Sequence, residues 1–176
     1  EHIAADFKLA RKHGTQCALH ELDCVFGCKD RVCIAESVRI HPFVCIDTHN
    51  GPVTIEEGCE IHPFTRIEGP AWIGPKTIIL GAKVREGCSI GPMCRIGGEV
   101  EESIIHGYSN KYHDGFLGHA YVGEFVNLGA LTTNSDLKND YTDVEVVLNG
   151  HKVNTHSTNV GSIIGDHTKT SIATLF

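Results

Sequence analysis

The feature that most constrains the fold of this chain is a phrase of six residues that repeats along most of its length. Each phrase begins with an aliphatic residue, continues with glycine, alanine, histidine or an acid, and carries a small residue at its fifth position. The phrase IHPF occurs twice, at 40–43 and 61–64. The phrases that fit are IAESVR (34–39), IHPFVC (40–45), IEEGCE (55–60), IHPFTR (61–66), IGPKTI (73–78), IGPMCR (90–95) and VGEFVN (122–127).

A period of six residues is neither the 3.6-residue period of an α-helix nor the alternation of a half-buried strand. It is typical of a short strand followed by a turn, repeated as the coils of a parallel β-helix. The aliphatic and small residues are expected to point inward, and coils stack at the usual strand spacing of about 4.8 Å. We therefore predict an all-β fold, a single-stranded parallel β-helix of hexapeptide repeats.

The first residues of the chain do not follow this repeat. Ile3, Phe7 and Ala10 recur at helical spacing, which predicts a short helix. We divide the chain into a linker with a short helix at 1–24 and a β-helix domain at 25–176. Because the chain opens on glutamate and stops in mid-pattern, we expect it to be a fragment of a longer protein.

Composition narrows the classes of partner. The chain has 15 basic and 22 acidic residues and a formal net charge of −7, so it lacks the basic stripe with which proteins neutralise the phosphates of nucleic acids. No apolar run approaches the roughly 18–20 residues of a membrane span, and no signal-peptide pattern opens the chain. We expect a cytoplasmic protein with no nucleic-acid or membrane partner and with reduced cysteines.

The chain has eight cysteines, which could indicate disulfides or a zinc site. Cys59, Cys88 and Cys94 occupy the small-residue position of their phrases, which indicates small buried side chains. Five further residues form a metal-like cluster, but their spacing lacks the paired CxxC of structural zinc sites, and we predict no metal there. The cluster comprises Cys17, His20, Cys24, Cys28 and Cys33.

The repeat breaks at 97–121 and at 133–158, and breaks in a repeat are where functional loops leave a scaffold. The stretch SNKYHDGFLGHAYVG at 109–123 gathers Lys111, His113 and His119 in one such break. The phrases GGEVEESI, SNKYHDGFLGHAYVGE, VNLGALTTNSDLKN and VGSIIGDHTKTSIATL surround it or follow it.

These phrases resemble the acyltransferase-type C-terminal domain of bifunctional sugar-1-phosphate nucleotidyltransferases. The chain is similar to N-acetylglucosamine-1-phosphate uridyltransferase/glucosamine-1-phosphate acetyltransferase, in its archaeal and alternative bacterial branch, over most of residues 30–176. The resemblance implies a left-handed β-helix, a homotrimer with active sites between neighbours, and transfer of an acetyl group from acetyl-CoA to an amino-sugar 1-phosphate such as glucosamine-1-phosphate. A Gly-rich phosphate loop for the nucleotidyl half is missing, so that activity is expected upstream of Glu1.

The resemblance also implies roles for individual residues. His113 matches the family's catalytic base, a task that suits histidine because its ordinary pKa lies near working pH. Asn127 matches an asparagine that binds the sugar. Further substrate-binding candidates are Lys111, Lys138, Phe116 and Arg95. The candidates for the CoA end are Lys169, Ser171, and Ala130 and Leu131, whose amides are expected to face the thioester oxygen.

Acetyl transfer of this kind requires no metal. The chain departs from the family where Phe116 stands in place of a tyrosine and where a basic pair for the sugar phosphate is incomplete. These departures favour an alternative, a non-catalytic domain that only oligomerises or regulates a sugar-1-phosphate nucleotidyltransferase. A second alternative is a zinc enzyme of the γ-carbonic-anhydrase kind using His106, His113 and His119, although the spacing of the last two differs by one residue. His41 and His62 are expected to be solvated turn residues. The sugar and the acyl group are not identified by the sequence.

Overall fold

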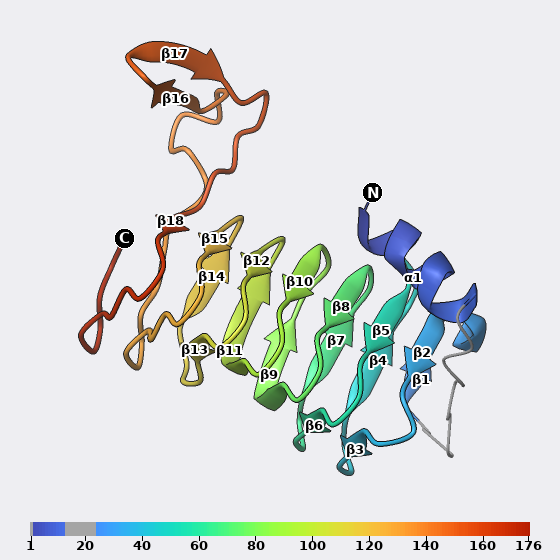
Figure 1. The fold of residues 1–176 in the computed structure, drawn as a ribbon. Helices are drawn as coiled ribbons and strands as arrows, with labels where there is room; N and C mark the ends of the chain where they lie inside the picture. Colours follow the sequence, from blue (N-terminus) through green and yellow to red (C-terminus); the bar gives the residue numbers. More distant parts are fainter. Residues whose placement is uncertain (1, 13–23) are drawn as a thin grey trace.

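The computed structural model describes residues 2–12 and 24–176 and shows a stack of coils built from short parallel strands (Figure 1). One seven-stranded sheet has the order β18-β15-β12-β10-β8-β5-β2. Its strands are β2 (Val32–Ile34), β5 (Val53–Ile55), β8 (Ala71–Ile73), β10 (Cys88–Ile90), β12 (Ile104–Ile105), β15 (Tyr121–Val122) and β18 (Ile163–Ile164).

A nine-stranded sheet forms the other walls of the stack, along the path β1-β4-β7-β9-β11-β13, with β3, β6 and β14 beside it. Pairing within both sheets is parallel, which confirms the predicted parallel β-helix. The strands are β1 (Val25–Phe26), β3 (Arg39–Ile40), β4 (Cys45–Asp47), β6 (Glu60–Ile61), β7 (Arg66–Glu68), β9 (Ile78–Val84), β11 (Arg95–Glu101), β13 (Asn110–Lys111) and β14 (Phe116–Gly118).

The core is a set of aliphatic ladders, one residue per coil. In the seven-stranded sheet each inward residue pairs with the corresponding residue of the next coil, and all are buried. Such ladders remove apolar surface from water at roughly 25 cal/mol per Å², which explains why the repeat keeps an aliphatic residue at this position. One ladder consists of Ile34, Ile55, Ile73, Ile90, Ile105, Val122 and Ile164.

Three cysteines fill the small-residue positions of the core, as predicted. Cys59, Cys88 and Cys94 are each at most 1% exposed. Burial raises the pKa of Cys59 and of Cys94 to about 11 and that of Cys88 to about 12. These thiols therefore stay protonated at neutral pH and act as small apolar side chains.

Two segments lie outside the regular stack. The helix α1 (His2–Lys12) contacts β2 and buries Phe7, so the predicted N-terminal helix is confirmed. The strands β16 (Glu145–Leu148) and β17 (His151–Asn154) form an antiparallel hairpin that projects away from the coils (Figure 1). A short 3₁₀ turn, η1 (Lys29–Arg31), precedes β2.

Some expectations concern residues that the structure does not describe. Cys17 and His20 of the metal-like cluster lie outside the described residues, while Cys28 is exposed and Cys33 is buried. The division of the chain at residue 24 stays a prediction. No helix within the described ranges has the length and apolar character that crossing a membrane requires.

Thiol alkylation tests this account of the core. In the native chain we expect Cys28 to react with iodoacetamide at the rate of an exposed thiol, and Cys88 to react only after unfolding, because the thiolate is the reacting species. Mass spectrometry of peptides from native and urea-unfolded samples measures both rates. Equal native rates at Cys28 and Cys88 would contradict the buried position of Cys88.

Candidate functional site

A row of outward-facing side chains crosses the last coils of the nine-stranded sheet in register. Arg95 of β11 pairs with Asn110 of β13. Asn127 forms parallel bridges to Asn110 on one side and to Lys169 on the other. Three predicted site residues, Arg95, Asn127 and Lys169, thus stand on one row, separated by single strand spacings or small multiples of them. We call Arg95, Asn110, Asn127 and Lys169 the polar row.

Asn110 belongs to this row although no motif pointed to it. Its side-chain Nδ2 donates a hydrogen bond to Oδ1 of Asn127 at 2.8 Å, which fixes the direction of the predicted sugar-binding amide. Aligning successive coils would have found Asn110, because it occupies the same place in its coil as Asn127 does in the next.

Lys111 occupies an inward ladder position. It pairs in register with Ile96 of the preceding coil and is only 4% exposed. The Nζ group donates hydrogen bonds to the carbonyl oxygens of Gly97 at 2.8 Å, His113 at 3.1 Å and Gly115 at 2.7 Å. An ammonium has three protons, so each one has an acceptor, and the turn 112–115 is tied to the coil below it. We call this set of contacts the lysine clamp.

Burial has an electrostatic consequence for the clamp. Desolvation lowers the pKa of Lys111 from 10.5 to about 8, while the negative charges of Asp114 and Glu99 act in the opposite direction. The three carbonyl contacts also favour the charged form. At neutral pH the ammonium therefore remains protonated and keeps its three donors. These contacts favour a structural role for Lys111, and its predicted contact with a sugar phosphate stays a prediction.

His113 lies on the clamped turn with an exposed side chain. Its ring stands edge-on to that of Tyr112, with 5.8 Å between ring centroids. The backbone of His113 is fixed through its carbonyl oxygen, while the imidazole stays accessible. The turn therefore presents a fixed histidine at a corner of the coil.

A hollow of about 250 Å³ adjoins this turn. Three glycines from successive coils, Gly81, Gly98 and Gly115, line it. Its charged and aromatic walls come from Lys83, Glu99, Asp114 and Phe116. Lys83 and Glu99 approach each other at 3.7 Å on the rim. The predicted substrate-binding residue Phe116 thus lines a recess directly after the turn that carries His113.

Arg95 faces the same turn from the polar row. Its guanidinium carbon lies 6.0 Å from the centroid of the Tyr112 ring, the outer limit of a cation–π contact. Within the described residues no carboxylate forms an ion pair with Arg95. Its positive charge is thus available to an anionic ligand.

The predicted CoA-binding residues lie on the last coils. The amide N–H of Leu131 donates to the carbonyl oxygen of Asp114 at 2.8 Å. It is therefore not a free donor for a thioester oxygen, because the turn already uses it, and contact of Leu131 with CoA stays a prediction. The carbonyl of Ala130 accepts from the amide of Ala173 at 2.7 Å. Ser171 is exposed.

Lys138 lies apart from the polar row, in the segment that leads to the hairpin. Its Nζ donates to Thr142 Oγ1 at 2.6 Å and to the carbonyl of Asp143 at 3.1 Å. These local contacts hold the base of the projecting segment. The predicted contact of Lys138 with a phosphate stays a prediction.

The three histidines of the zinc alternative do not converge within this chain. His119 is held between Asp136, at 2.7 Å from Nδ1, and Glu102, at 3.0 Å from Nε2. The ring of His106 packs against Tyr121 at 4.9 Å. Among the described residues, the group whose ligand atoms gather closely enough to share a metal ion lies elsewhere, at His41, Glu60 and His62.

Comparison with known proteins gives a partial match. No family model matches the chain. It is 34% identical over 74 residues to a bifunctional sugar-1-phosphate nucleotidylyltransferase/acetyltransferase of Sulfurisphaera tokodaii. The resemblance indicated by the motifs is confirmed. The matched stretch is 42% of this chain and only 18% of that relative. The activities of the whole relative are therefore only proposed for this chain.

Among solved structures, the chain is similar to PerB from Caulobacter crescentus, a structure in complex with CoA and GDP-perosamine. The match covers 72% of this chain and 50% of PerB, with 22% sequence identity and a TM-score of 0.25. A TM-score of 0.25 is too low for comparing the two sites.

The lysine clamp predicts a large effect of a single substitution. Lys111→Met keeps an apolar stem but removes the donor that three carbonyl oxygens share, of which that of Gly115 keeps the amide of Glu99. A buried carbonyl left without a donor costs about 1–3 kcal/mol. We expect the free energy of unfolding to fall by at least about 2 kcal/mol in urea denaturation. Lys152→Met, on the exposed hairpin, is the control and should change it by less than about 0.5 kcal/mol. Equal effects of the two substitutions would show that the clamp contributes nothing.

Proposed function

We propose that this chain is the acetyltransferase domain of a sugar-1-phosphate nucleotidylyltransferase/acetyltransferase. It transfers an acetyl group from acetyl-CoA to the amine of an amino-sugar 1-phosphate of the glucosamine-1-phosphate kind. The observation that carries the proposal is the exposed imidazole of His113 on the clamped turn, beside the polar row. The partial identity to a bifunctional relative supports it.

His113 is the proposed general base. The sugar amine reacts in its neutral form, because a protonated amine has no lone pair to form the new bond. His113 removes one proton from the amine nitrogen as that nitrogen attacks the carbonyl carbon of the thioester. The tetrahedral intermediate then collapses, the carbon–sulfur bond breaks, and the imidazolium returns the proton to the CoA sulfur. Lys111 does not touch the reacting atoms in this scheme and is a positioning residue for the turn.

The polar row supplies the proposed binding contacts. Asn127, oriented by Asn110, hydrogen-bonds sugar hydroxyls. Arg95 pairs with the sugar phosphate, a role that fits a guanidinium with no ion pair among the described residues. Lys169, at the far end of the row, and Ser171 meet CoA. Phe116 packs on the sugar where related enzymes have a tyrosine.

We also propose a homotrimer in which a neighbouring copy completes the site. A row of exposed apolar side chains crosses the seven-stranded sheet in register at Ile104, Tyr121 and Ile163. These residues are 47%, 45% and 80% exposed in the single chain. Such a row on a flat sheet favours association between copies. An imidazole that is open to solvent in one chain is enclosed when a second chain packs beside it.

The alternative is a domain that assembles or regulates the parent enzyme without catalysis. Two observations favour it, namely Phe116 in place of a tyrosine and the Leu131 amide that is already paired. The fixed position of His113 favours catalysis, since a purely structural corner needs no exposed histidine.

An acetylation assay separates the two functions. The chain is incubated with acetyl-CoA and glucosamine-1-phosphate, or other amino-sugar phosphates, and the release of CoA thiol is followed. Removal of a general base typically costs about 10²–10⁴-fold in rate, so we expect a loss in this range for His113→Ala. The control is His151→Ala on the exposed hairpin, which should match the unaltered chain.

The outcomes distinguish the candidates clearly. Thiol release that persists at the same rate in His113→Ala would exclude His113 as the base. No release from any amino-sugar phosphate by the unaltered, folded protein, tested together with its nucleotidyl half, would support the scaffold alternative. Equal melting temperatures of the two variants would show that the loss is not caused by unfolding.

A further inference from the structure

A second group of side chains lies on the nine-stranded sheet at the end nearer the N-terminus. His41 and His62 directly follow β3 and β6, which pair in register so that Arg39 lies opposite Glu60 and Ile40 opposite Ile61. The two histidines therefore occupy equivalent places in neighbouring coils. Glu60 precedes His62 by two positions and shares its face of the strand. The repetition of IHPF in the sequence produces this arrangement.

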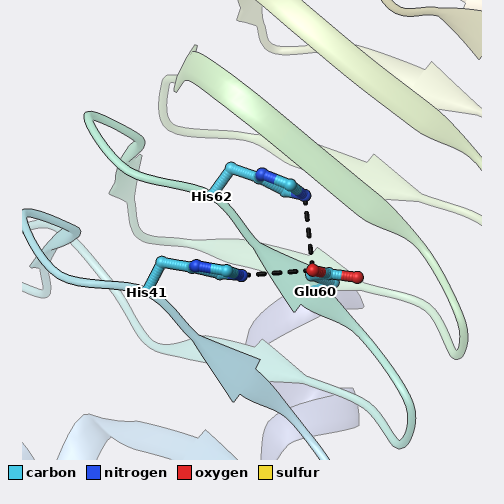
Figure 2. A group of neighbouring side chains, drawn as sticks. All are labelled: His41, Glu60 and His62. Carbon is cyan, nitrogen blue, oxygen red and sulfur yellow. Dashed lines mark hydrogen bonds and ion pairs between the residues drawn. The ribbon is translucent and has the colours of Figure 1, made fainter.

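The three side chains converge on one another. The two imidazoles are stacked, with 4.8 Å between ring centroids and 14° between planes. Figure 2 shows both rings turned toward the carboxylate of Glu60. Oε1 of Glu60 lies 3.1 Å from Nε2 of His41 and 3.5 Å from Nε2 of His62. The two imidazole side chains are 38% and 28% exposed. They are thus partly solvated, as expected, but strand register also places both rings beside one carboxylate.

Two of the three separations between donor atoms approach what a small divalent cation requires. Zinc with ligand bonds of about 2.0–2.1 Å holds the donor atoms of a tetrahedron about 3.3 Å apart. The three donor atoms here all lie within 4.8 Å of one another, and two of the three separations are close to the tetrahedral value. Two imidazole nitrogens and one carboxylate oxygen are a ligand set that zinc and similar divalent ions accept, with a fourth position left for water.

We propose that His41, Glu60 and His62 bind one divalent transition-metal ion of the zinc type. Each imidazole offers its Nε2 lone pair and Glu60 offers Oε1. In the metal-free chain a neutral ring can carry its proton on Nε2 and donate it to that oxygen. Metal binding at Nε2 then requires the proton to lie on Nδ1. A charged ring, which has a proton on both nitrogens, releases one on metal binding.

The residues around the cluster fit this assignment. Arg39 contacts the other carboxylate oxygen, Oε2, at 2.6 Å, which orients Glu60 and leaves Oε1 facing the rings. Ile78 of β9 pairs with Glu60, so the next coil places an apolar side chain beside the carboxylate. The guanidinium of Arg39 adds one unfavourable charge, but its side chain is 74% exposed and well solvated.

The proposed metal site is separate from the acetyl-transfer site. The register runs from Glu60 through Ile78, Arg95 and Asn110 to Asn127. Asn127 is thus four strand spacings from Glu60, or about 19 Å, and Arg95 is two spacings away, or about 10 Å. The ion would join ligands from two successive coils and thus stabilise the first part of the stack. This role does not depend on acetyl transfer.

Titration with ZnCl₂ tests the site. The protein used is the full chain with Cys17, Cys24 and Cys28 replaced by serine, so that thiolates do not compete for the ion. Isothermal titration calorimetry is expected to show one equivalent bound. Loss of one ligand, in His41→Ala, His62→Ala or Glu60→Gln, should weaken binding at least about tenfold. Zinc should raise the melting temperature of the chain, but not that of His62→Ala.

A matched control exists in the same sheet. His49 contacts Asp47 at 2.7 Å, and Arg66 contacts the other oxygen of that carboxylate at 3.2 Å. Like the proposed metal site, this group combines an imidazole, a carboxylate and a guanidinium. These contacts include one histidine where the proposed site has two. His49→Ala should leave zinc affinity unchanged.

Three results would overturn the proposal. They are no bound equivalent at millimolar zinc, an affinity that is unchanged in both histidine variants, or an equal loss in His49→Ala. Glu60→Gln preserves the shape of the side chain, so it tests the site even if an alanine variant does not fold. Because the readouts are affinity and melting temperature, the outcome does not depend on the acetylation assay.

Discussion

In-register stacking of the coils is the constraint on which the rest of this structure depends. Parallel hydrogen bonding places every residue one strand spacing from its equivalent in the next coil. Inward positions therefore become aliphatic ladders, and outward positions become rows. The polar row through Asn127 and the cluster at His41, Glu60 and His62 are two parts of one sheet. A repeat selected for packing thus also aligns side chains for binding.

The lysine clamp shows how such a scaffold holds an irregular turn. Where the preceding coils place an isoleucine, Lys111 reaches under the corner and binds three carbonyl oxygens. A buried ammonium is costly unless its donors are all paired, and here the structure pairs them. The ladder position that packs one coil on another becomes the anchor of the turn that carries His113. Rigidity of this kind is what a general base needs in order to meet its substrate.

The repeat made the coil architecture predictable, and the spacing of Cys59, Cys88 and Cys94 made their burial predictable. The inward direction of the Lys111 side chain was not predictable, because a lysine in a phrase that breaks the period is normally interpreted as a surface charge. Extending the register by one coil would have placed it opposite Ile96. The pairing of Asn110 with Asn127 and the convergence of His41 with His62 also depend on register between distant phrases. A motif considered on its own does not show which distant phrase lies beside it in the fold.

The polar row pairs with the first part of β11, and Phe116 beside the hollow pairs with its last part. The turn of His113 lies between β13 and β14, and the proposed chemistry requires that the sugar amine reach the imidazole there. A crystal structure of the chain with CoA and glucosamine-1-phosphate tests this most directly. We expect the amine nitrogen within about 2.6–3.2 Å of an imidazole nitrogen of His113, with the thioester end of CoA beside it. A sugar bound away from His113, with that imidazole facing only solvent in the assembled protein, would contradict it.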